Sequence, residues 1–165
     1  MNDLEKEYIK TNIDHRYYVK FFITKIIEEL SHRANVHDSS KYSNDETVGF
    51  VKAIPYTKIK WGSTDIPNDI ANSLQDSLLI HHSRNDHHPE YFENGIEDMD
   101  LIQLIELVCD WRAAMIRHNN FDIDETICVG QTRFKFCDSI ARILQNTLER
   151  IDTYVDAAEI VKPKM

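Results

Sequence analysis

The sequence is poor in residues that break helices and in residues that cross-link chains. Its 165 residues include four glycines, four prolines and three cysteines. So few glycines and prolines exclude a collagen, a low-complexity linker protein and a turn-rich β-sandwich. The cysteines are odd in number and form no Cys-x-x-Cys pair, which favours free thiols over a disulfide framework or a zinc ribbon.

Positive charge is also scarce. The chain has 19 lysines and arginines against 28 aspartates and glutamates, a formal net charge of −9. Binding along a nucleic-acid backbone depends mainly on lysine and arginine, so we expect no long nucleic acid as a partner. A small anionic ligand is compatible with this charge, because bound metal ions would reverse its sign locally.

Long apolar runs are missing as well. No segment approaches the roughly 20 apolar residues that span a bilayer. The first residues, Met-Asn-Asp-Leu-Glu-Lys-Glu, lack the basic end and apolar run of a secretory signal. We therefore expect a cytoplasmic protein without membrane contact.

The apolar residues that are present, 42% of the chain, recur at helical spacing. This pattern predicts an all-α fold of about five to seven helices in a single domain over residues 1–160, with a loose tail at 161–165. Capping residues and prolines place helices at about 3–32, 43–53, 69–84, 98–117 and 132–160. Residues 56–68 are expected to be a connector, and the acidic cluster Asp122–Glu125 is expected to start a helix.

Histidine is unusually concentrated in one part of the sequence. Seven of the eight histidines lie within residues 15–88. His37 is followed by Asp38, a carboxylate that can bridge two metal ions beside an imidazole that binds one of them. His15 and His81 fall on the inward faces of their predicted helices, and His82 is a weaker candidate. Inward histidines are also common as core residues without a metal.

Asp110 lies on a narrow polar stripe of the predicted helix at about 98–117, which is otherwise apolar all round. Such a stripe faces either water or a polar site inside the protein. We favour the polar site, because a carboxylate here completes the set of metal ligands. The candidate set in chain order is His15, His37, Asp38, His81, His87 or His88, and Asp110.

This order resembles the HD superfamily of metal-dependent phosphohydrolases, in its form with two additional histidines before the final aspartate. The string His37-Asp38-x-x-Lys41 is similar to the His-Asp-x-Gly-Lys string of its cyclic-dinucleotide phosphodiesterase and inositol oxygenase branches, with Ser40 in place of the glycine. The strings at 37–43, 85–92 and 109–111 look like those of an uncharacterised family of short phage and bacterial HD-type proteins.

The resemblance implies an HD-type helical bundle with two divalent metal ions, drawn from Mn, Fe, Zn, Co, Ni and Mg. The implied metal ligands are His15, His37, Asp38, His81, His87, His88 and Asp110. Asp38, Lys41 and Glu106 are the expected catalytic residues, with Lys41 on a phosphate oxygen and Glu106 orienting a ligand histidine. The expected substrate contacts are Lys41, Arg84, Asn85 and Arg117, and Glu90 is a further candidate ligand or proton carrier.

These residues favour hydrolysis of a nucleotide or another small phosphoester by metal-activated water. One alternative is a di-iron oxygenase of the inositol oxygenase type, because the same set of ligands can activate dioxygen. Another is a non-catalytic, metal-stabilised protein that binds nucleotides or acts as an inhibitor. The expected partner is a small phosphorylated molecule, and a homo-oligomer is compatible with the sequence. The sequence has no P-loop, dinucleotide-binding glycine motif or nucleophile elbow.

Overall fold

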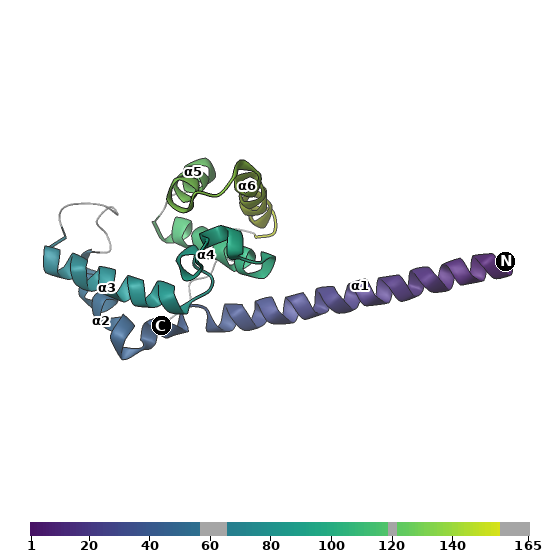
Figure 1. Ribbon diagram of the computed structural model, residues 1–165, viewed down its shortest axis with the longest axis horizontal. Helices are drawn as coiled ribbons and strands as arrows, with labels where there is room; N and C mark the ends of the chain where they lie inside the picture. Colours follow the sequence, from purple (N-terminus) through teal and green to yellow (C-terminus); the bar gives the residue numbers. More distant parts are fainter. Residues whose placement is uncertain (57–65, 119–121, 156–165) are drawn as a thin grey trace. The chain divides into compact units, whose positions relative to one another are not determined.

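A computed structural model describes residues 1–56, 66–118 and 122–155 of the chain. In these residues the secondary structure consists of six α-helices and short 3-10 helices, with no strand (Figure 1). The all-α prediction of about five to seven helices is confirmed. None of the helices in the described part is both long and apolar enough to cross a membrane.

The chain divides into two compact units, Met1–His37 and Asp38–Met165. The single domain expected over 1–160 stays a prediction. The first unit is one uninterrupted helix, α1 (Asp3–Val36), drawn in purple in Figure 1. Its N-terminal cap is Asn2, which forms a reciprocal capping box with Glu5. The helix continues past His32 because no glycine or proline interrupts it before His37.

The second unit begins with two helices that pack closely, α2 (Asn44–Ala53) and α3 (Asn68–Arg84). A 3-10 helix, η1 (Ser39–Tyr42), precedes α2, and another, η2 (Ile54–Tyr56), follows it. Gly49 lies where the two helices meet: a Cβ on it would stand 2.1 Å from the backbone oxygen of Ser73. Its N–H donates a hydrogen bond to Ser77 Oγ at 3.0 Å. Only glycine permits so close an approach between α2 and α3.

The apolar core of the second unit lies among α4 (Leu101–His118), α5 (Ile123–Phe134) and α6 (Asp138–Asp152). Leu107, Leu144 and Leu148 are at most 1% exposed. Two short 3-10 helices, η3 (Pro89–Tyr91) and η4 (Gly95–Asp98), connect α3 to this group. Trp111 stacks on Phe134 with ring centroids 6.3 Å apart, which supports a structural role for this tryptophan.

The prediction of a single helix over about 132–160 is wrong. The chain ends α5 at Phe134 and starts α6 at Asp138, because Lys135 adopts a left-handed conformation (φ 59°). Phe136, 3% exposed, then enters the core between the two helices. Asp122 caps α5, so the expected helix start at the acidic cluster is confirmed. Residues 57–65 of the expected connector, including Trp61, and the expected helix end and tail at 156–165 lie outside the described residues.

Candidate metal centre

Asp38 occupies a special backbone position at the start of the second unit. Its φ of 58° and ψ of 9° are left-handed, a conformation that aspartate tolerates better than most residues. Asp38 caps η1, and its backbone oxygen accepts a hydrogen bond from the N–H of Lys41 at 3.0 Å. The turn brings the side chain of Lys41 back to the carboxylate, with Nζ 2.5 Å from Oδ2.

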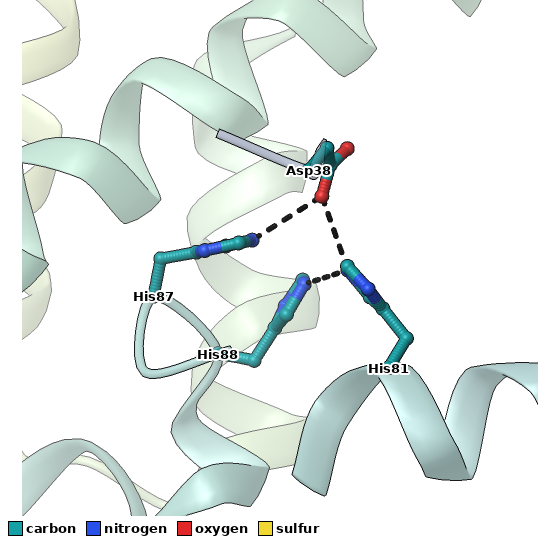
Figure 2. A group of neighbouring side chains, drawn as sticks. All are labelled: Asp38, His81, His87 and His88. Atoms are coloured by element: carbon teal, nitrogen blue, oxygen red, sulfur yellow. Dashed lines mark hydrogen bonds and ion pairs between the residues drawn. The ribbon is translucent and has the colours of Figure 1, made fainter. Parts of the chain in front are cut away.

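Two histidines, His81 and His87, lie against the other oxygen of Asp38, and a third, His88, contacts His81 (Figure 2). Asp38 Oδ1 lies 3.1 Å from Nε2 of His81 and 3.5 Å from Nε2 of His87. Nε2 of His88 lies 2.9 Å from Nε2 of His81. His81 and His87 are 1% and 3% exposed, so these two imidazoles are the buried part of the cluster.

The end of α3 explains how residues so close in sequence face one another. The helix stops at Arg84 because Asn85 is extended, and the Asn85 amide caps the helix by donating to the backbone oxygen of His81 at 2.7 Å. His88 is also extended, as expected before Pro89, which is fully buried. This reversal turns His87 and His88 back toward His81.

The surroundings of Asp38 and His88 keep these two groups in the protonation states that bind metals. Burial would raise the pKa of Asp38, but hydrogen bonds from His81, His87 and Lys41 outweigh it and hold that pKa well below its usual range. Burial, together with the neighbouring charges of His87, His82 and His81, lowers the pKa of His88 to about 3. At neutral pH, Asp38 is therefore a carboxylate and His88 a neutral imidazole, the forms that ligate metal ions.

The geometry allows these four residues to hold a metal ion. One ligand atom from each of Asp38, His81, His87 and His88 lies within 4.8 Å of the others. Three imidazole nitrogens with one carboxylate form a donor set of the kind that binds divalent transition metals. His82, His88 and Glu90 form a second group of the same compactness, in which Glu90 is also held by Arg133 at 2.5 Å.

A second layer of polar residues surrounds His81. Its Nδ1 lies 2.9 Å from Oε2 of Glu46, a residue of α2 that is completely buried. Ser40 donates a hydrogen bond to the same carboxylate oxygen at 2.9 Å. Sequence reasoning missed Glu46, because an acidic residue in the first turn of a helix is expected there without any functional role. In the structure, the side chain of Ser43 forms no cap and Glu46 faces His81.

His87 has an acidic neighbour too, since its Nδ1 lies 3.4 Å from Oε1 of Glu106 on α4. This position agrees with the expected orienting role of Glu106, which stays a prediction. Asp110 is half-buried on the same helix, and its charge raises the pKa of His88 against the larger effect of burial. Asp110 thus acts electrostatically on the cluster, and its role as a ligand stays a prediction.

The expected substrate contacts have different surroundings. Lys41 pairs with Asp38, at the edge of the cluster. Arg84 pairs with Asp45 at 2.6 Å and with Glu46 at 3.4 Å, and these contacts indicate a structural role. Asn85 donates to Ser40 Oγ at 2.8 Å. Arg117 is exposed near the end of α4, beside the imidazole of His118.

The other two predicted ligands belong to the first unit. His15 is exposed on α1, and His37 ends that helix directly before Asp38 in the chain. Their participation in the metal centre stays a prediction.

These observations define an all-helical protein with a buried aspartate–histidine cluster that can hold a metal ion. The chain belongs to a family of unknown function (DUF5662), whose model matches residues 4–152. No curated protein and no solved structure matches the chain.

Proposed function

We propose that this protein is a metal-dependent phosphohydrolase of the HD type that acts on a nucleotide or another small phosphoester. The observation that carries the proposal is the gathering of His81, His87 and His88 around the carboxylate of the His37-Asp38 pair. The donor set of three imidazoles and one carboxylate favours Zn, Mn, Fe, Co or Ni over Mg, which prefers oxygen ligands.

Asp38 and Lys41 lie at the exposed part of the cluster. The side chains of Asp38 and Lys41 are 28% and 35% exposed, whereas His81 is 1% exposed. A substrate would therefore approach along Asp38 and Lys41, with the histidines behind them. A phosphate oxygen placed here would meet the Lys41 ammonium, which is already held at the site.

These positions give each residue a separate role in the proposed reaction. Asp38, His81, His87 and His88 would hold the metal, and Glu46 and Glu106 lie against the far nitrogens of His81 and His87. A bound divalent metal supplies positive charge that polarises a phosphoryl oxygen and lowers the pKa of a water molecule. Lys41 would neutralise charge on the substrate without being a metal ligand.

Metal analysis of anaerobically purified protein, followed by assays with mono-, di-, tri- and cyclic nucleotides, tests the proposal. We expect bound transition metal and release of phosphate or nucleoside monophosphate that a chelator abolishes. Asp38→Asn should lose both metal and turnover. Asp45→Asn is the matched control, because Asp45 is an acidic residue nearby that pairs with Arg84 outside the cluster.

Three results would overturn the proposal in different ways. Consumption of dioxygen by iron-loaded protein, without hydrolysis, would favour the di-iron oxygenase. Tight metal and nucleotide binding without any turnover would favour a binding or inhibitor protein. Hydrolysis that survives complete metal removal would exclude the metal mechanism.

A further inference from the structure

Glu46 is a carboxylate in an unusual position, because it is 0% exposed and lies directly behind the candidate metal centre. It projects from the first turn of α2 toward Nδ1 of His81 on α3. Its Oε1 lies 3.4 Å from the Arg84 guanidinium, and its Oε2 accepts from Ser40. A carboxylate is expensive to bury, so this arrangement calls for a specific role.

The groups around Nδ1 of His81 leave it one acceptor for a hydrogen bond. The Ser40 hydroxyl donates to Glu46, so it has no proton left for Nδ1, 3.2 Å away. The Asn85 amide donates to Ser40 Oγ and to the backbone oxygen of His81, which uses both of its N–H groups. Glu46 Oε2, 2.9 Å from Nδ1, is therefore the acceptor for a proton on this nitrogen, whereas Asp38 Oδ1 lies 3.1 Å from Nε2 on the other side of the ring.

The helix pair fixes this contact from both sides. Gly49 lies one turn after Glu46 on α2, and Ser77 lies one turn before His81 on α3. The hydrogen bond from Gly49 N–H to Ser77 Oγ holds the two helices in close approach there. The contact between Glu46 and His81 is therefore set by backbone packing and not by two freely moving side chains.

We propose that Glu46 is the positioning residue for His81: it accepts a hydrogen bond from Nδ1 and so leaves Nε2, which lies beside Asp38, to bind the metal. The role rests on the proposed metal centre. Metal-bound histidines commonly donate their second ring N–H to a carboxylate, and loss of such a partner typically lowers metal affinity by about 10- to 100-fold.

Glu46→Met tests the role, because methionine has a similar size and no acceptor. In this variant the Ser40 hydroxyl and the Asn85 amide become the donors facing Nδ1, so the proton should move to Nε2. Proton–nitrogen correlation spectra of the metal-free protein should show Nδ1 of His81 protonated in the wild type and unprotonated in Glu46→Met. A merely structural residue would not move this signal.

Titration with Co²⁺, followed by its visible absorption, gives the second measurement. We expect affinity to fall by about 10- to 100-fold in Glu46→Met. Glu46→Gln, which keeps an acceptor oxygen, should show a smaller loss. Asp45→Asn is the matched control, since Asp45 shares Arg84 with Glu46 and does not contact His81. Melting curves check that each variant is folded.

The outcomes separate this proposal from the proposed function. If the wild type bound no Co²⁺, the metal centre itself would be refuted. If wild type and Glu46→Met bound Co²⁺ equally, with Nδ1 of His81 protonated in both, the positioning role alone would be refuted and the metal centre would stand.

Discussion

Lys41 pairs with the carboxylate of Asp38 and is 35% exposed. Because its ammonium neutralises Asp38 without lying among the histidines, removal of its charge should spare metal binding. We expect Lys41→Met to keep metal content and melting temperature, and to lower kcat/KM by roughly tenfold to a hundredfold through loss of one charge-assisted hydrogen bond. Steady-state kinetics on the best nucleotide substrate measures this. An unchanged rate would remove Lys41 from the mechanism.

His88 gives a prediction for pH. Its pKa is lowered to about 3 in the fold, from an ordinary value of 6.5. Below about pH 6.5 the unfolded chain therefore binds a proton that the folded chain does not, so the stability of the metal-free protein should fall as the pH drops toward 3. The contribution is about 1.4 kcal/mol per pH unit, or about 2 kcal/mol between pH 6.5 and 5.

Urea denaturation of chelator-treated protein at several pH values measures this loss. His88→Gln has no proton to bind, so its stability should fall less steeply across the same range. His118→Gln, an exposed histidine at the end of α4, should retain the wild-type slope. Equal slopes in wild type and His88→Gln would show that His88 is not held neutral.

The sequence predicted the environment of a candidate site residue only where that environment depends on the residue's own helix. The helical wheel placed His81 inward, where it is buried. The same argument placed His15 inward, and His15 is exposed on α1. Glu46 could not be found this way, since its partner lies 35 residues ahead on another helix. Its place in the first turn of α2 accounts for an acidic residue by local contacts alone, so only the packing of α2 on α3 identifies its role.

At the scale of helices, the approach of α2 to α3 depends on Gly49. In an exposed helix, alanine would be more favourable than glycine by up to about 1 kcal/mol. Here an alanine Cβ would lie 2.1 Å from the backbone oxygen of Ser73, which cannot rotate away. We expect Gly49→Ala to destabilise the fold by about 1–3 kcal/mol, the usual cost of overpacking, and to weaken metal binding because Glu46 and His81 would separate.

Denaturation curves and Co²⁺ titration measure both effects. Val48→Ala is the matched control, because Val48 is the adjacent residue of α2 and is 49% exposed. It should remain within about 0.5 kcal/mol of the wild type and bind metal normally. A Gly49→Ala variant as stable as Val48→Ala would show that α2 and α3 are not held in close approach.

The predicted helix boundaries agree with the structure only where a particular type of residue starts or ends the helix. Asn85 and Pro89 end α3 where expected. The break between α5 and α6 was missed because apolar spacing continues through it. Lys135 is not a residue that favours a left-handed conformation, and the burial of Phe136 between the helices determines the turn. A helix break that depends on tertiary packing cannot be predicted from the neighbouring residues in the sequence.

At the scale of the whole molecule, composition was enough for the fold class. Few glycines and prolines, with apolar residues at helical spacing, predicted the helices that the described residues form. The division into Met1–His37 and Asp38–Met165 was not predicted. Periodicity reports that a helix has an apolar face, and it carries no information on which surface covers that face.

The predicted role of His15 belongs to this scale, because His15 and the Asp38 cluster lie in different units. If His15 is a ligand of a second metal ion, His15→Ala should lower the metal content by about one ion per chain, since one lost imidazole weakens a metal position severely. His81→Ala should remove the other ion. His32→Ala is the matched control, because His32 is an exposed histidine on the same helix. Metal analysis after dialysis counts the ions, and equal content in His15→Ala and His32→Ala would exclude His15 from the centre.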